Sequence, residues 1–372
     1  MSTEAQETPS ARRRPSYLIP AAIVVGCVLV QLGLWRWLEG DSSKQVFSSY
    51  VMFPLVPFLL LIWWLFFSRV KMKLRLGVTA AAAMAAVLFF SIFKLEGYSG
   101  DFIPKFSLRW KSAPEADASH LKIVSPESGA KDAPIERLEV TPADWPQFGG
   151  PARDSIARGE KVRTDWKENP PKALWKHPIG LGWSSFAIVD RFAFTQEQVG
   201  PNEFVVCYNA ETGEPVWTHS DPTRFVSVMG GDGPRATPTI HDSRIYSLGA
   251  TGVLNCLDAR SGKLFWTKNI LEDAKVDVPQ WGATGSPLLF GNLCVVSPGG
   301  MTGSALVAYD RMTGERVWNG GSHGPGFASP VLTKIQGLRQ ILMFYADGVA
   351  GHDAATGKEL WHFAWSNVNE NN

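Results

Sequence analysis

Five residues able to bind a ligand lie in loops that precede short apolar segments in the second half of the chain. They are Trp183, Asp232, Arg235, Trp281 and His323. If these side chains met in one funnel, the indoles could stack on a flat group and the guanidinium could bind carboxylates, while the Asp could hold a metal ion or accept a proton. The favoured interpretation is structural: the same residues would close the ends of strands and fill a central channel.

Several common catalytic and metal-binding motifs are absent from the sequence. There is no Cys-x-x-Cys, Gly-x-Ser-x-Gly, P-loop or His-Glu-x-x-His segment, and the seven histidines are scattered. No metal site is therefore predicted, and Asp232 is a candidate catalytic residue only if the protein is an enzyme. The formal net charge of +1 comes with no basic stripe, so nucleic acid is not an expected partner.

The loops are spaced by a repeat that ends in tryptophan. In each copy an apolar strand is followed by Asn or Asp, two or three variable residues, Thr or Ser, Gly and a short run into Trp. The closing residues are Trp217, Trp266, Trp318 and Trp361, at spacings of 49, 52 and 43 residues. This is the period of a propeller blade, and the strand candidates between copies give four strands per blade.

Each copy also has the chemistry of a β-hairpin. The Asn or Asp can accept hydrogen bonds from backbone N–H groups and start a turn, and the glycine four positions later can supply the positive φ that the turn needs. The Trp then lies on the outer strand, where burying its large surface requires a neighbouring blade. The turn residues are Asn209, Asp258, Asp310 and Asp353, and the glycines are Gly213, Gly262, Gly314 and Gly357.

A fifth tryptophan suggests that the ring is incomplete. The segment around Trp175 resembles the outer strands, yet no three strands precede it in the chain. In a closed propeller such a strand pairs with strands supplied by the C-terminal end. We therefore expect four blades plus one unpaired strand, truncated from a larger ring, and a complete four-bladed ring with a spare strand is the alternative.

Three apolar segments near the N-terminus are long enough to cross a membrane. Residues 17–35, 46–67 and 76–93 contain no charged residue, and about 20 apolar residues span the hydrocarbon core as a helix. Three arginines at positions 12–14 precede the first segment, and basic residues fill the loop before the third. By the positive-inside rule the N-terminus is cytoplasmic and the chain after the third segment is exported.

These features divide the chain into four parts. Residues 1–16 are expected in the cytoplasm, residues 17–93 form a membrane domain, and residues 94–143 form a polar extracytoplasmic linker. Residues 144–372 form the propeller, on the periplasmic side of the inner (cytoplasmic) membrane. Cys27 lies in the first span, and the remaining cysteines, Cys207, Cys256 and Cys294, are interpreted as buried thiols, with a disulfide as the second interpretation.

The repeat, seen best in residues 308–318, resembles that of the pyrroloquinoline-quinone (PQQ) propeller family. Residues 144–151, 233–238 and 249–258 strengthen the resemblance, although position 149 is Gly where the family pattern has Arg. The family includes dehydrogenases that bind PQQ and Ca²⁺ in the central funnel. It also includes proteins similar to the propeller lipoprotein of the outer-membrane assembly machine, which act through protein contacts. The resemblance is specific for the fold and does not decide the activity.

Two functions follow from this resemblance. The favoured one is a non-catalytic binding or scaffolding module of the bacterial cell envelope, with no cofactor and with a protein or glycan partner. The alternative is a PQQ-dependent dehydrogenase that oxidises a sugar or alcohol and passes electrons to membrane quinone. There Arg235 would bind the cofactor carboxylates, Trp183 or Trp281 would stack on its rings, and Asp232 would be a metal ligand or base. The adjacent Cys-Cys pair of many such alcohol dehydrogenases is absent.

Overall fold

The chain forms two compact units, Met1–Lys94 and Leu95–Asn372. The computed structural model describes residues 18–39, 42–98, 104–110, 121, 138–158, 163–227 and 230–365. The predicted cytoplasmic segment, residues 1–16, lies outside the described residues, as does most of the predicted linker. The two units are described separately below.

The first unit consists of long apolar helices. They are α1 (Leu18–Trp37), α2 (Ser42–Ile62), the π-helical turn η1 (Trp63–Phe67) and α3 (Met72–Ile92). Three stretches, Leu18–Trp37, Phe47–Phe67 and Met72–Ile92, are long and apolar enough to cross a membrane, as the sequence predicted. The Gln31 side-chain amide donates to the hydroxyls of Ser48 and Ser49 at 2.9 and 3.0 Å, so a polar contact joins α1 to α2.

The third helix begins earlier than the sequence predicted. Because α3 starts at Met72 rather than at residue 76, Lys73 and Arg75 belong to its first turn and not to the preceding loop. The Arg75 guanidinium donates to the Leu65 carbonyl at 2.6 Å and thereby ties this turn to η1. A basic residue at a helix end can extend its charge away from the apolar region, so the positive charge stays near the helix terminus.

Part of the range predicted as a linker has regular structure. Strands β1 (Phe93–Tyr98) and β2 (Pro104–Leu108) form a two-stranded sheet. Further along, Leu138 is buried in the apolar core between blades 1 and 2, and its backbone N–H donates to the Ser243 hydroxyl at 2.9 Å. Single apolar residues in a polar segment gave no periodic signal, which is why the sequence did not predict these contacts.

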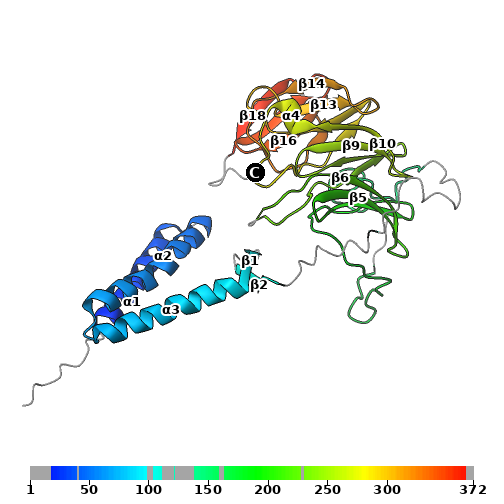
Figure 1. Ribbon diagram of the computed structural model, residues 1–372. Helices are drawn as coiled ribbons and strands as arrows, with labels where there is room; N and C mark the ends of the chain where they lie inside the picture. The colour runs from blue at the N-terminus through cyan, green and yellow to red at the C-terminus, as the bar shows by residue number, and fades with distance from the viewer. Residues whose placement is uncertain are drawn as a thin grey trace, which may run out of the picture. The chain divides into compact units, whose positions relative to one another are not determined.

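Four antiparallel four-stranded sheets make up the propeller, and they follow one another in sequence order from green to red in Figure 1. Blade 1 is β3 (Ala187–Val189), β4 (Phe192–Val199), β5 (Asn202–Asn209) and β6 (Pro215–Asp221). Blade 2 is β7 (Thr239–His241), β8 (Arg244–Leu248), β9 (Val253–Asp258) and β10 (Leu264–Asn269), followed by the short helix α4 (Ile270–Ala274).

Blades 3 and 4 repeat the same order. Blade 3 is β11 (Leu288–Phe290), β12 (Leu293–Val296), β13 (Leu306–Asp310) and β14 (Arg316–Gly320). Blade 4 is β15 (Val331–Ile335), β16 (Leu338–Tyr345), β17 (Gly348–Asp353) and β18 (Glu359–Ala364). The prediction of four blades with four strands each is therefore confirmed.

The predicted hairpin chemistry is present in every blade. In blade 1 the Asn209 side-chain oxygen accepts from the N–H groups of Glu211 and Thr212 at 2.9 and 3.1 Å. The Asp residues of the other blades accept in the same way. All four hairpin glycines have φ between 70° and 76°, in the left-handed region that glycine tolerates best.

Each of the first three repeat tryptophans packs against the hairpin glycine of the next blade. A Cβ placed on Gly262 would lie 2.5 Å from the Trp217 ring, and Gly314 and Gly357 stand in the same relation to Trp266 and Trp318. The indole N–H of Trp217 also donates to the Ala259 carbonyl at 3.0 Å. Glycine at these positions thus lets an indole ring lie flat on the backbone of the neighbouring blade.

Trp175 occupies the same kind of contact, but the predicted strand around it does not form. Its ring lies against Gly213 of blade 1, and its indole N–H donates to the Ala210 carbonyl at 2.9 Å. Residues 174–178 are nevertheless irregular, since no described strand pairs with them, and a strand needs a paired neighbour. Whether further blades complete the ring stays a prediction.

The apolar core is divided among the junctions between blades. One cluster joins blades 1 and 2 and contains Cys207, a second joins blades 2 and 3 and contains Cys256 and Cys294, and a third joins blades 3 and 4. All three cysteines are buried and free, which confirms their interpretation as buried thiols. Cysteine here acts as a small apolar residue in sheet packing.

Candidate functional site

Four of the five predicted loop residues gather around one backbone segment. A Cβ on Gly230 would lie 2.6 Å from the Trp281 ring, and a Cβ on Gly231 would lie 2.8 Å from Trp183 Nε1. The Arg235 guanidinium donates to the carbonyls of these two glycines at 3.1 and 2.6 Å. We call Trp183, Asp232, Arg235 and Trp281 the loop cluster.

The charged members of the loop cluster are engaged by their own loop. One Asp232 oxygen accepts from the Arg224 guanidinium at 2.9 Å, and the other accepts from the Ser227 N–H at 3.0 Å. The Arg235 guanidinium also lies 5.1 Å from the centre of the Phe225 ring, a cation–π distance. Burial lowers the pKa of Arg235, although the charges of Asp232 and Glu203 partly offset this effect.

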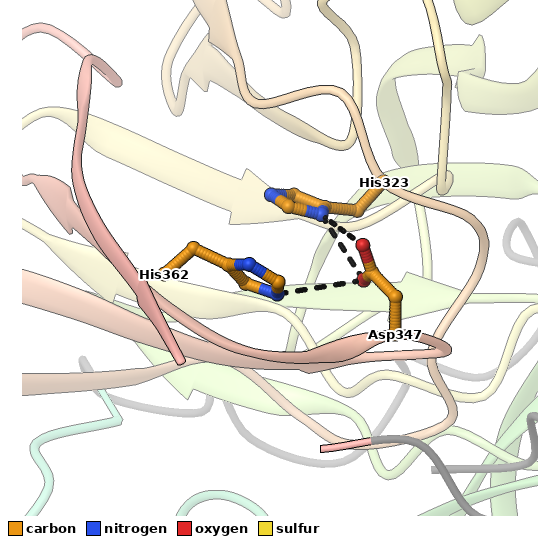
Figure 2. A group of neighbouring side chains, drawn as sticks. All are labelled: His323, Asp347 and His362. Atoms are coloured by element: carbon orange, nitrogen blue, oxygen red, sulfur yellow. Dashed lines mark hydrogen bonds and ion pairs between the residues drawn. The ribbon is translucent and has the colours of Figure 1, made fainter. Parts of the chain in front are cut away.

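His323, the fifth predicted residue, belongs to a different group of side chains. Its Nδ1 lies 2.9 and 3.1 Å from the two Asp347 oxygens, and its Nε2 lies 2.9 Å from Glu359 Oε2. His362 Nε2 lies 3.8 Å from the same Asp347 carboxylate, and Figure 2 shows the side chains of His323, Asp347 and His362 together. We call His323, Asp347, Glu359 and His362 the histidine cluster.

Three separate segments of blade 4 supply the histidine cluster. His323 comes from the loop between β14 and β15, Asp347 from the turn between β16 and β17, and His362 from β18. The His323 ring stacks on Tyr345 with 4.6 Å between ring centres, and Tyr345 belongs to the core between blades 3 and 4. The His323 ring is therefore held on one face by Tyr345 and at its two nitrogens by carboxylates.

The electrostatics of the histidine cluster favour a charged imidazole. Burial acts to lower the pKa of His323, but hydrogen bonds to Asp347 and Glu359 outweigh it, and the net shift is upward. Burial acts to raise the pKa of Asp347, whereas its hydrogen bond to His323 lowers it, and the net shift is downward. Each group thus favours the charged form of the other.

A second group of buried polar residues lies between blades 1 and 2. Gln198 pairs with Glu203 across β4 and β5, and Glu203 pairs with Asp221 across β5 and β6. The Asn255 amide of blade 2 donates to Asp221 at 2.7 Å. Burial raises the pKa of Glu203 to about 7, the Ala250 N–H bond opposes this, and the Asp221 charge adds to it. We call these four residues the buried polar row.

Sequence reasoning named His323 but missed its partners. Asp347, Glu359 and His362 carry no metal-binding spacing, and the first lies in a two-residue turn without a family motif. One signal was available: the turn after the second strand of a blade and the loop before the first strand lie at the same end of an antiparallel sheet. Counting strand directions would have placed Asp347 beside the His323 loop.

Comparison with known proteins confirms the predicted resemblance to the PQQ-repeat propellers. Residues 201–372 match the family described as outer membrane protein assembly factor BamB. The chain is 31% identical over 170 residues to the 1-butanol dehydrogenase (quinone) of Thauera butanivorans, covering 40% of this chain and 25% of that protein. It is 29% identical over 149 residues to a quinoprotein ethanol dehydrogenase of Pseudomonas putida, covering 35% and 22%.

Solved structures with some similarity include both kinds of protein. A quinohemoprotein alcohol dehydrogenase from Comamonas testosteroni has a TM-score of 0.43 and 18% identity, covering 68% of this chain and 45% of that chain. BamB from Moraxella catarrhalis has a TM-score of 0.34 and 16% identity, covering 51% and 65%. The chain spans a quarter or less of the length of the two dehydrogenases to which its sequence was compared above.

The loop cluster supplies only part of what the PQQ group that the resemblance implies would need. A cofactor with several carboxylates needs cationic donors, and two of the five Arg235 N–H groups already donate to the Gly230 and Gly231 carbonyls. A Ca²⁺ ion needs 6–8 oxygen ligands, and the loop cluster offers one carboxylate, Asp232, which accepts from Arg224 and from the Ser227 N–H. We therefore derive no chemical step through this cofactor.

Proposed function

We propose that this protein is a membrane-anchored propeller of the bacterial cell envelope whose loop cluster binds a protein partner without catalysis. The three apolar helices provide the anchor, and the arginines before α1 orient it so that the propeller lies outside the cytoplasm. The matches to BamB support an envelope role, and the matches to dehydrogenases leave the activity open.

The observation that carries this proposal is an exposed aromatic on a loop held by internal hydrogen bonds. Trp183 is 66% exposed and its backbone N–H donates to the Pro234 carbonyl at 2.8 Å, while the Arg235 guanidinium holds that neighbouring loop through the Gly230 and Gly231 carbonyls. The nearby side chain of Val226 is also exposed. Large aromatic residues on a preorganised surface lose little entropy on binding, and for this reason they dominate protein interfaces.

A second candidate function, quinone-dependent alcohol oxidation, is favoured by one specific observation. The sequence matches to the 1-butanol and ethanol dehydrogenases reach about 30% identity over some 150 to 170 residues. For this function the Arg235 guanidinium would have to bind the cofactor carboxylates, in addition to the Gly230 and Gly231 carbonyls or in their place. The two candidates therefore differ in what Arg235 contacts.

Site-specific photocrosslinking in native membranes tests the proposed binding surface. A photoreactive phenylalanine analogue replaces Trp183 in the full-length chain, and the same analogue replaces Val317, an exposed residue of the outer strand β14, as the matched control. We expect a discrete crosslinked protein at position 183 and none at position 317. Equal crosslinking at both positions, or a glycan adduct alone, contradicts the proposal of a protein partner.

Cofactor titration of the purified full-length chain tests the alternative. PQQ and Ca²⁺ are added with an alcohol and an electron-accepting dye, and the absorption spectrum and dye reduction are followed. We expect neither a bound-quinone band nor dye reduction. Dye reduction that disappears in Arg235→Ala, with an unchanged circular dichroism spectrum, would establish the dehydrogenase instead.

A further inference from the structure

Two histidines and a carboxylate from three segments converge at the end of blade 4. One nitrogen of His323, one of His362 and an oxygen of Asp347 all lie within 4.8 Å of one another. Figure 2 shows both imidazole rings turned toward the same carboxylate. This cluster is separate from the loop cluster, and neither proposed function uses it.

We propose that His323, Asp347 and His362 bind a divalent transition-metal ion, with Zn²⁺ as the best match. Two imidazole nitrogens and one carboxylate oxygen are a donor set that suits Zn²⁺ and related ions, whereas Ca²⁺ and Mg²⁺ prefer oxygen ligands alone. Three protein ligands leave a fourth tetrahedral position for solvent, and the Asp347 side chain is half exposed at 51%.

The distances in the cluster are close to those that an ion would impose. Ligand atoms about 2.0–2.1 Å from a tetrahedral ion lie roughly 3.3 Å from each other. Here Asp347 Oδ1 lies 3.1 Å from His323 Nδ1 and 3.8 Å from His362 Nε2, and one ligand atom from each of the three residues lies within 4.8 Å of the others. Binding would require the Asp347 and His362 side chains, both partly exposed, to rotate toward a shared ion.

Glu359 provides the outer partner that a metal-binding histidine usually has. Its Oε2 lies 2.9 Å from His323 Nε2, so an N–H at Nε2 can donate to this carboxylate. In the tautomer protonated at Nε2, Glu359 accepts this hydrogen bond and Nδ1 carries a lone pair directed toward Asp347. In the metal-bound form, the ion replaces the proton that otherwise links Nδ1 to Asp347.

Glycine leaves space for the second histidine. Gly348 follows Asp347 with a φ of 149°, and a Cβ at this position would lie 2.8 Å from His362 Nε2. His362 in turn pairs with Ala350 across β17 and β18, and Ala350 belongs to the core between blades 3 and 4. The cluster is therefore on the side of blade 4 that faces blade 3.

Metal binding would tie three segments of blade 4 together. The loop that carries His323 leads from blade 3 into blade 4, so the ion would also fix the junction between the two blades. Binding to the folded state alone stabilises a protein in proportion to the logarithm of ligand concentration over Kd. We therefore expect Zn²⁺ to raise the melting temperature of the propeller.

Zn²⁺ titration of the full-length chain, purified without a histidine tag and stripped with EDTA, tests this site. We expect one ion per chain by calorimetry, a preference for Zn²⁺ over Ca²⁺ and Mg²⁺, and visible absorption of a tetrahedral Co²⁺ derivative. His362→Ala and Asp347→Asn should abolish stoichiometric binding, and Glu359→Gln should weaken it by about 10- to 100-fold.

The matched control uses another histidine that faces an aspartate. His241 Nε2 lies 3.4 Å from Asp242 in an exposed position, and no third ligand joins them among the described residues, so His241→Ala should leave Zn²⁺ binding unchanged. Circular dichroism confirms that each variant is folded, and Asp347→Asn on the exposed turn is the variant least disturbing to the core. Absence of Zn²⁺ binding by the wild type, or equal binding by His362→Ala and Asp347→Asn, would overturn the proposal.

Discussion

Two junctions of the propeller can be compared: that between blades 1 and 2 and that between blades 3 and 4. Each contains the same kind of tryptophan contact, but the two differ in their buried charges. At the first junction, the Glu203 side chain is 3% exposed, and burial raises its pKa to about 7. No cation lies at hydrogen-bond distance from it among the described residues. At the second, His323 lies between the carboxylates of Asp347 and Glu359. The repeat therefore determines how blades pack, while residues outside the repeat determine how each junction responds to pH and ions.

The largest expected effect tests what the two junctions share. Trp217 and Trp318 are 2% and 8% exposed and lie on Gly262 and Gly357 of the following blades. Replacement of either by alanine should lower the free energy of unfolding by about 3–5 kcal/mol, because a large cavity forms between sheets. Urea unfolding followed by circular dichroism measures this loss. The exposed Trp183→Ala is the control, and a similar loss there would show that the inter-blade contact is not the cause.

The next effect separates the junctions through Glu203→Gln. The pKa of Glu203 is about 7 in the folded state, above the ordinary value of 4.5. Protonation of this carboxyl therefore contributes fully to stability below pH 4.5, and the contribution is lost as pH rises through 7. Glutamine mimics the protonated acid. The variant should be more stable than the wild type by about 2–3 kcal/mol at pH 9 and nearly equal at pH 4.

Urea unfolding at several pH values gives the stability curve of each protein. Glu211→Gln, at an exposed hairpin position, is the matched control and should not change the curve. A Glu203→Gln curve parallel to that of the wild type would show that this carboxyl does not titrate in the range given.

His323→Gln should act in the opposite direction. Because hydrogen bonds to two carboxylates raise the pKa of His323 above 6.5, its stabilising charge is complete below pH 6.5 and is lost as pH rises through the folded pKa. In EDTA at pH 6 we expect the variant to lose about 1–2 kcal/mol, and less at pH 9. Thermal unfolding measures the difference against His241→Gln, and a loss that is independent of pH would point to packing on Tyr345 alone.

The smallest effect concerns one hydrogen bond. The Trp217 indole N–H donates to the Ala259 carbonyl, whereas the buried Trp318 N–H has no acceptor among the described residues. Trp217→Phe should therefore cost about 1 kcal/mol more than Trp318→Phe. Urea unfolding of the two variants gives the comparison, and equal costs would show that the N–H contributes nothing to docking.

Much of the fold could be predicted from the sequence because the repeat is local. Each copy contains its own turn residue, its own glycine and its own tryptophan within 11 residues, so one copy is enough to predict a hairpin. The prediction around Trp175 was only half right: its indole docks on Gly213, but no strand forms. Strand formation depends on a partner, and a partner cannot be seen in the segment itself.

The candidate sites could be predicted only in part. The loops that hold Trp183, Arg235 and Trp281 were identified, but their grouping around Gly230 and Gly231 depends on the path of the backbone. His323 was predicted at the funnel mouth, and the structure adds that it contacts Asp347 and Glu359, which the sequence did not predict. No local pattern joins residues that are 24 and 36 positions apart in the chain.

The sequence by itself determined the blade architecture, the hairpin glycines, the tryptophan contacts and the three membrane-capable helices. These depend on residue type and short spacing, which set turn geometry and apolar surface directly. Only the tertiary structure decided that Arg235 binds its own loop, that Glu203 is buried with a raised pKa, and that His323, Asp347 and His362 converge. Such contacts form between different strands and loops, and the sequence of one segment does not show which other segment will pack against it.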